Sequence, residues 1–179
     1  MNGHRAWVLL RVAVVIVANL VGFALFQAPF RTAETWASRG LVDLFADGRT
    51  FHATDTAIGV LPFHGRAFVA IVTPSCSALA SALAIVCLSF AMSRLGRRRQ
   101  VVAAAAAVVV IAAGNVVRIA LSVGFGVLAG RASLVLFHDW VGGVLTFAYT
   151  LGGYLLMLAV LLPRGPALDP SRREEPVHA

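Results

Sequence analysis

The sequence contains no lysine and only two cysteines among its 179 residues, and charged side chains of every kind make up just 13% of it. So little charge excludes an ordinary soluble domain, because such domains carry about 25% charged residues. The apolar share is correspondingly high, at 59%, and the mean hydropathy is +0.85. We therefore expect an integral membrane protein.

The two cysteines, Cys76 and Cys87, are predicted to share one helix and so cannot form a disulfide with each other. Eleven residues of helix separate their Cα atoms by about 16 Å, whereas a disulfide needs less than about 7 Å. Cys87 lies in the middle of an apolar stretch, where burial disfavours the thiolate form. We interpret it as a packing residue.

Long apolar runs make up most of the chain. A spanning helix needs roughly 20 apolar residues, and four runs predict transmembrane helices at about residues 7–26, 76–93, 101–128 and 139–162. The first is expected to remain as a span, since no small-residue cleavage site closes it. The expected fold class is an all-α membrane protein with about four transmembrane helices, in a single integral membrane domain over residues 1–163. The tail at residues 164–179 is expected to be disordered and cytoplasmic.

All 15 positive charges are arginines and the net charge is +7, which raises nucleic-acid binding as an alternative. The charge distribution argues against it, because the densest cluster, Arg94 with residues 97–99, lies in a short link between two apolar spans, where cytoplasmic arginine is expected. We therefore predict membrane lipids, and no nucleic acid, as partners. The same rule makes this a multi-pass protein of the inner (plasma) membrane, with both chain ends cytoplasmic and residues 29–75 and 130–137 on the extracytoplasmic side.

The extracytoplasmic segment between the first two spans is expected to begin with a helix. Thr32 and Thr35 are candidate N-caps, and the apolar residues within 36–45 give an amphipathic pattern. Such a helix would lie in the membrane interface or pack on the bundle, and the sequence leaves both arrangements open.

Two β-branched, apolar runs follow, at residues 58–63 and 67–72, and the short segment between them contains Gly65. This pattern predicts a short β-hairpin. The hairpin leads into Pro74 and then Cys76, and a proline disfavours continuing a strand at this point. Cys76 is therefore expected to open the next helix at its outer end, where the helix dipole and unpaired N–H groups stabilise a thiolate.

Arg118 is a charged residue within a predicted span. Counted from Val101 it lies about 25 Å along its helix, and charged residues inside spans usually face a bundle interior or a water-filled cavity. Asn115 lies three residues earlier on the same helical face. The two predict a polar site near the outer face, although a long side chain that reaches the interface would also explain Arg118.

The predicted topology brings Cys76, Arg118 and His138 from three helices to one depth on the outer side. A cysteine, a base that deprotonates it and a cation that stabilises an oxyanion are the components of acyl transfer. We therefore predict these three as catalytic residues. Asp139, adjacent to the histidine, is a candidate to orient the imidazole, and Ser77, Asn115 and Asp139 are the expected supporting or substrate-binding residues. No metal or organic cofactor is expected.

These residues resemble the motifs of the exosortase/archaeosortase family of membrane-embedded cysteine transpeptidases. The family pattern is a cysteine at the start of a helix, then Asn-x-x-Arg, then His-x-x-x-Gly. The matching residues are Cys76, Asn115 with Arg118, and His138 with Gly142. The family's usual glycine two residues after the cysteine is an alanine in this chain.

The resemblance implies an enzyme that cleaves the C-terminal sorting signal of an exported protein at the outer face of the membrane. In that reaction Cys76 attacks the scissile carbonyl, His138 moves the proton and Arg118 stabilises the oxyanion. The new carboxyl end then passes to an acceptor, such as a lipid or a glycan.

Two other functions stay open at the level of sequence. In a non-catalytic membrane scaffold, Asn115 and Arg118 would only link helices through hydrogen bonds. In a small transporter subunit, Arg118 would bind an anion. Loss of function on removing Cys76 separates the enzyme from both, because neither alternative uses a thiol.

Overall fold

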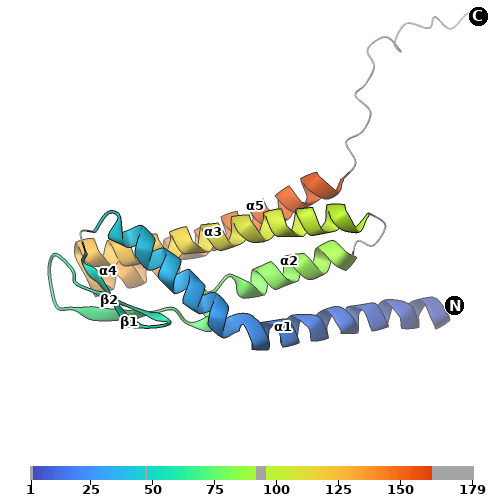
Figure 1. Ribbon diagram of the computed structural model, residues 1–179, viewed down its shortest axis with the longest axis horizontal. Coiled ribbons are helices and arrows are strands. Elements are labelled where there is room, and N and C mark those ends of the chain that lie inside the picture. Colours follow the sequence, from blue (N-terminus) through green and yellow to red (C-terminus); the bar gives the residue numbers. More distant parts are fainter. Residues whose placement is uncertain (1, 47, 92–95, 163–179) are drawn as a thin grey trace, which may run out of the picture.

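The computed structural model describes residues 2–46, 48–91 and 96–162, so the tail predicted to be disordered lies outside the described residues. Most of the chain is helical, and a small sheet lies at one end of the helices, opposite the N-terminus (Figure 1). The elements, in chain order, are α1 (Asn2–Asp43), β1 (Thr50–Thr54), β2 (Ala57–Val60), β3 (Phe68–Ile71), a 3-10 turn (Pro74–Cys76), α2 (Leu79–Ala91), α3 (Arg97–Ala129), α4 (Arg131–Leu136), a π-helical turn (Phe137–Val141) and α5 (Gly142–Leu161).

Within the described residues, three helical stretches are long and apolar enough to cross a membrane, and they lie in α1, in α3 and in α4 continued by α5. The expected span at residues 76–93 starts later than predicted, at Leu79, and its last two residues lie outside the described residues. Its helix, α2, has 13 residues, which corresponds to about 20 Å and falls short of the roughly 30 Å hydrocarbon core. The described part of the chain thus offers three candidate spans where four were predicted, and α2 is a shorter apolar helix within it.

The predicted first span and the predicted amphipathic helix are one continuous helix, α1, of 42 residues. It contains Pro29 and bends partway along its length (Figure 1), as expected where a helix loses a backbone donor. The prediction that Thr32 and Thr35 begin a separate helix is wrong. Their hydroxyls instead donate to the carbonyls of Ala28 (3.1 Å) and Arg31 (2.8 Å), one turn earlier, which is the bond that threonines make inside a helix.

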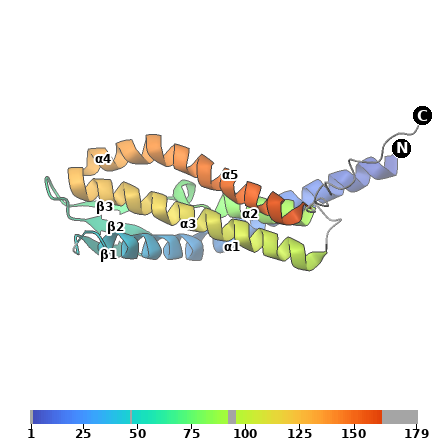
Figure 2. The ribbon, with the colours of Figure 1, turned by 90° about the horizontal axis from the view of Figure 1, so that it is seen from above.

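The predicted hairpin is part of a three-stranded antiparallel sheet in the order β1-β2-β3. β2 and β3 correspond to the two predicted strands, with Val60 opposite Phe68, and Gly65 between them has φ of 104°, a value that glycine adopts most easily. β1 was not predicted, because its five residues, TFHAT, contain a single large apolar side chain. Figure 2 shows the sheet lying beside the second half of α1, and β2, the central strand, also contacts α3.

The segment predicted as a short link, residues 130–137, is helical. Gly130 has φ of 81° and ends α3, after which α4 and the π-helical turn lead directly into α5. The chain therefore reverses direction at Gly130 alone. This places the π-helical turn beside α3, where it can deliver side chains to the face of α3 that carries the polar residues.

Two apolar clusters hold the elements together. One joins the sheet to α1 and α3 and includes the fully buried Ile58 and Val60. The other joins α2, α3 and α5 and contains small residues of α3 such as Ala103 and Ala107, which have no exposed surface. Small residues let membrane helices approach closely, and α5 meets α3 in the same way through its glycines.

The close approach of α5 to α3 depends on Gly153. A Cβ atom there would lie 2.8 Å from Ile111 Cγ1 and 3.2 Å from the carbonyl oxygen of Ala107, whereas one at the adjacent Gly152 would meet nothing within 4 Å. We expect Gly153→Ala to destabilise the protein by roughly 1–3 kcal/mol through overpacking, while Gly152→Ala leaves stability unchanged or slightly raised. Thermal unfolding of the two variants in detergent measures the difference, and equal melting temperatures would contradict this packing.

Candidate active site

The structure brings together the three side chains that the sequence singled out. Cys76 lies in the 3-10 turn, Arg118 on α3 and His138 in the π-helical turn. The Sγ atom of Cys76 lies 3.2 Å from Nε2 of His138, and Nη2 of Arg118 lies 3.1 Å from the same nitrogen. Residues separated by 62 positions in the chain are therefore within hydrogen-bonding distance.

These contacts determine which nitrogen of His138 carries the proton. A guanidinium has donors only, so Arg118 donates its Nη2–H to Nε2, and that nitrogen acts as the acceptor. The ring proton then belongs on Nδ1, which lies 3.1 Å from Oδ1 of Asp139. The single lone pair of Nε2 is thus shared between the Arg118 donor and the thiol, and it accepts the thiol proton when the arginine bond is given up. Asp139 holds the other side of the ring, as in the arrangement of a general base.

Cys76 is placed differently from the prediction. It was expected to open the helix, but it lies in the 3-10 turn, three residues before α2 begins at Leu79. Pro74 starts this turn, since it has no N–H to continue the strand. The nearest hydroxyl is that of Thr73, whose Oγ1 lies 3.0 Å from Sγ. The polar neighbours of the thiol are therefore side chains, and the start of α2 is not directly beside it.

Ser77 was expected to support the site, and its hydroxyl has a different contact. Its Oγ accepts a hydrogen bond from the backbone N–H of Leu79 at 3.3 Å, which is the bond of a helix N-cap. Ser77 therefore fixes the start of α2 directly after the turn that carries Cys76. Its contribution to the site is to the backbone, because the hydroxyl bonds to a helix amide.

A buried polar network lies beneath the reactive group. Nδ2 of Asn115 donates to Oε1 of Glu34 (2.7 Å) and to the carbonyl oxygen of Cys76 (2.9 Å), while Oδ1 of Asn115 accepts from Nη1 of Arg118 (3.3 Å). The same Glu34 oxygen accepts from the backbone N–H of Ala78 at 3.1 Å. The exposed fractions of Glu34, Asn115 and Arg118 are 3%, 0% and 7%. One amide side chain thus connects a buried carboxylate to a buried guanidinium.

Glu34 was missed by the sequence analysis, which described this region by two candidate N-cap threonines and by its apolar residues. Polar residues at a helical spacing would have indicated it, because Arg31, Glu34 and Ser38 fall on one face of a continuous helix. All three reach the interior. Nε of Arg31 donates to the carbonyl of Val72 (2.9 Å), and Oγ of Ser38 donates to the carbonyl of Val116 (3.2 Å).

Tyr149 of α5 was also missed, although it completes the hydrogen bonding of Asn115. Its hydroxyl donates to Oδ1 of Asn115 at 2.9 Å. It approaches so closely because Gly114 has no side chain, and a Cβ atom there would lie 2.5 Å from Cβ of Tyr149. A tyrosine in an apolar helix gives little signal in a sequence, since such residues commonly lie at membrane interfaces.

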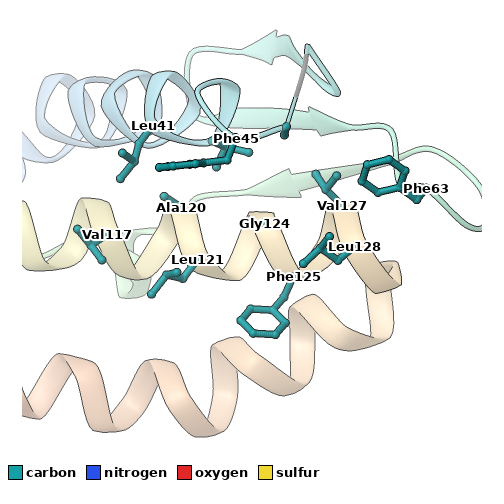
Figure 3. Close-up of a pocket in the computed structure, with 12 residues that line it drawn as sticks. Leu41, Phe45, Phe63, Val117, Ala120, Leu121, Gly124, Phe125, Val127 and Leu128 are labelled. Atoms are coloured by element: carbon teal, nitrogen blue, oxygen red, sulfur yellow. The ribbon is translucent and has the colours of Figure 1, made fainter.

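The sulfur and the imidazole line a cavity of about 280 Å³ between β3, α3 and α4. Its other walls are mostly apolar and include Ala70, Ile71 and Leu134. A larger cavity, about 430 Å³, lies on the opposite face of α3 and is lined entirely by apolar residues and glycine (Figure 3). Only the smaller of the two therefore combines apolar walls with reactive groups, as a substrate site does.

The described residues contain no group of three His, Cys, Asp or Glu side chains placed to hold a metal ion. The second thiol, Cys87, lies on α2 within an apolar helix and is half-buried. The reactive groups that meet in this site are thus a thiol, a base with its orienting carboxylate, and a cation. These are the components of nucleophilic acyl transfer.

No protein-family model, no curated protein and no solved structure matches this chain. Any function must therefore be argued from the site itself.

The position of the Arg118 side chain depends on Gly142. A Cβ atom at Gly142 would lie 2.9 Å from Nε of Arg118, whereas one at Gly143 would meet nothing within 4 Å. We expect Gly142→Ala to displace the guanidinium from Cys76 and His138 and to slow alkylation of Cys76 by iodoacetamide about 10-fold, because a nearby cation favours the thiolate. Gly143→Ala is the matched control, and equal alkylation rates in the two variants would contradict this role.

Glu34 provides a second test, which concerns stability. Glu34→Leu leaves the Asn115 amide and the Ala78 N–H without their acceptor and leaves Arg118 without a nearby negative charge, so we expect a loss of about 3 kcal/mol. Glu34→Gln keeps an acceptor oxygen and should cost about 1 kcal/mol. Unfolding in mixed detergent micelles compares the two variants. An equal loss for both would show that the acceptor oxygen is unimportant.

Proposed function

We propose that this protein is a membrane-embedded cysteine transpeptidase or protease of the exosortase/archaeosortase type. It cleaves a C-terminal sorting signal of an exported protein at the extracytoplasmic face of the plasma membrane and transfers the new carboxyl end to an acceptor. The observation that carries the proposal is the shared contact of Cys76 Sγ and Arg118 Nη2 with Nε2 of His138, at 3.2 and 3.1 Å.

The proton chemistry follows from this contact. Nε2 of His138 takes the proton of the Cys76 thiol, and the thiolate attacks the scissile carbonyl carbon. The tetrahedral intermediate collapses to a thioester when the amide C–N bond breaks, and the leaving amine receives the proton from Nε2. The acceptor's nucleophilic group then attacks the thioester, gives its proton to the same nitrogen and releases the thiol.

Arg118 acts at the step where negative charge develops. In the resting site its Nη2–H is donated to Nε2 of His138, but a protonated imidazole has no lone pair to accept that bond. Proton transfer from Cys76 therefore frees a buried, charged donor just as the carbonyl oxygen becomes an oxyanion. An interaction that is stronger in the transition state than in the ground state lowers the barrier.

The charges of α3 support the proposed sidedness. Arg97, Arg98 and Arg99 begin the helix, and positively charged ends are expected in the cytoplasm. Nη2 of Arg99 donates to the carbonyl of Leu162 at 2.7 Å, so the end of α5 lies at the same side. Arg118 is 19 residues further along, or about 28 Å, which is close to the thickness of the hydrocarbon core.

The order of the motifs supports the family assignment within this proposal. A cysteine, Asn-x-x-Arg and His-x-x-x-Gly occur in the family's order, and the residues concerned contact one another. The geometry supplies a reason for the final glycine, since Gly142 leaves room for Arg118. Ala78, where the family usually has glycine, is 3% exposed and packs in the apolar core.

The proposed nucleophile is tested by labelling spheroplasts with a membrane-impermeant maleimide. We expect Cys76 to be labelled from outside and Cys87 to be protected, and His138→Ala to slow the labelling of Cys76 about 100-fold through loss of the base.

Processing in the native host is a second test of the nucleophile. With Cys76→Ala, exported proteins that have a C-terminal hydrophobic helix should stay full-length in the membrane. With Cys87→Ala, they should be processed normally.

Other outcomes separate the alternative functions. Normal cell function with Cys76→Ala would favour a non-catalytic scaffold. Transport that is lost with Arg118→Gln but kept with Cys76→Ala would favour a transporter subunit. Labelling of Cys76 from the cytoplasmic side alone would overturn the proposed sidedness.

A further inference from the structure

The strand that leads to the reactive cysteine has a free edge. β3 is the last strand of the sheet and pairs only with β2. Val72 donates its N–H to the carbonyl of Thr56 across that pairing at 2.8 Å, and backbone groups alternate sides along a strand. The N–H and C=O groups of Val69 and Ile71 therefore point away from β2. No described residue forms a hydrogen bond with these groups.

The two edge strands of the sheet, β1 and β3, differ in how easily another strand could pair with them. β1 carries an irregularity between His52 and Thr54 that interrupts its pairing with β2, and bulges and polar residues are the usual devices against unwanted strand pairing. β3 has a regular register and the sequence FVAI. Its Val69 and Ile71 side chains are 51% and 64% exposed. A flat apolar edge left open is a template for another strand.

The free edge continues into the reactive site. β3 ends at Ile71, five residues before Cys76, and the cavity that contains the sulfur is also lined by Ala70 and Ile71 of β3. The facing wall is α4, through Leu134 and Val135. A polypeptide held along β3 would thus have its side chains in an apolar groove and its next peptide bond at the thiol.

We propose that the substrate binds as an added strand, with the residues upstream of the scissile bond extended along the free edge of β3. This inference rests on the proposed function, since it concerns the same site. The direction follows from the topology. The hydrophobic helix of the signal continues among the spans beyond Cys76, so the upstream residues run parallel to β3. Main-chain hydrogen bonds to Val69 and Ile71 supply affinity, and the groove selects small, uncharged side chains.

A peptidyl affinity reagent tests this on the intact protein. Acetyl-Ala-Ala-Ala chloromethyl ketone alkylates a thiol as the S–CH₂ bond forms, chloride leaves and the thiol proton passes to His138. We expect it to modify Cys76 at least about 10-fold faster than chloroacetone, which carries the same reactive group without a peptide.

The variant Val69→Pro tests the free edge itself. It removes one N–H donor from this edge without removing a bond to β2. It should lower the rate at which the peptidyl reagent alkylates Cys76 about 5- to 10-fold and leave the rate with chloroacetone unchanged.

Methylated reagents make the test independent of folding in the variant. Along an added strand, only every second amide of the peptide faces β3. Two reagents, one N-methylated at the second alanine and one at the third, should therefore differ. One should lose its rate advantage over chloroacetone in alkylating Cys76, and the other should keep it. Loss or retention of the advantage in both would overturn added-strand binding.

The failure of this inference is distinguishable from failure of the proposed function. If chloroacetone modifies Cys76 in a His138-dependent manner but the peptide gives no advantage, the nucleophile stands and the binding mode is wrong. If Cys76 does not react with chloroacetone, the proposed function fails as well. A dimer of this chain that Val69→Pro dissociates, with an unchanged peptidyl rate, would assign the edge to a second copy of the chain and overturn the proposal.

Discussion

The arrangement of this site depends on the burial of one positive charge. Arg118 is 7% exposed, and removing a guanidinium from water costs on the order of several kcal/mol unless its donors and its charge are matched. Its side chain donates hydrogen bonds to neutral oxygen or nitrogen atoms of Cys76, Asn115 and His138. The compensating negative charge is Glu34, which is reached through the amide of Asn115. The burial of Arg118 therefore requires α1, the 3-10 turn, α3 and the π-helical turn to meet at one point.

The same hydrogen bonds hold the backbone of Cys76 in place and leave its sulfur free to react. The carbonyl oxygen of Cys76 accepts hydrogen bonds from both Asn115 and Arg118, so its backbone is held from α3. Among the described residues, the hydrogen-bonding neighbours of the sulfur are Thr73 and His138. Catalytic geometry is usually precise when supporting contacts hold the backbone of a nucleophile and leave its reactive atom free. In this chain those supporting contacts are buried and mostly involve charged or amide groups.

The sequence was sufficient to predict long helices and the side chains that meet at the site, because both depend on strong local signals. Runs of about 20 apolar residues predict spans, and a charged residue such as Arg118 inside one is costly enough to indicate a site. The end of each element was harder to predict. The turn before Leu79 shortened the second span, because a proline and a capping serine stop the chain from entering the helix earlier.

Glu34 and Tyr149 could not be identified from a pattern of neighbours, since their roles depend on helices that are distant in sequence. Glu34 meets Asn115 across 81 residues, and Tyr149 meets it across 34. Pro29 added to the difficulty, because a proline within an apolar run usually suggests the end of a helix. In this chain it bends α1 without ending it, so the outer half continues to the buried site.

The shortness of α2 has a consequence for the surrounding lipid. A helix of about 20 Å placed in a hydrocarbon layer of about 30 Å is accommodated when the layer thins around it or polar groups move inward. Beside α2 the headgroups and their water would therefore come closer to the membrane centre than they do around α3. Cys76 lies in the 3-10 turn three residues before this helix begins, so a polar acceptor attached to a lipid could reach the thioester without entering the hydrocarbon. Hydrophobic mismatch would then favour transfer to molecules that reside in the headgroup layer.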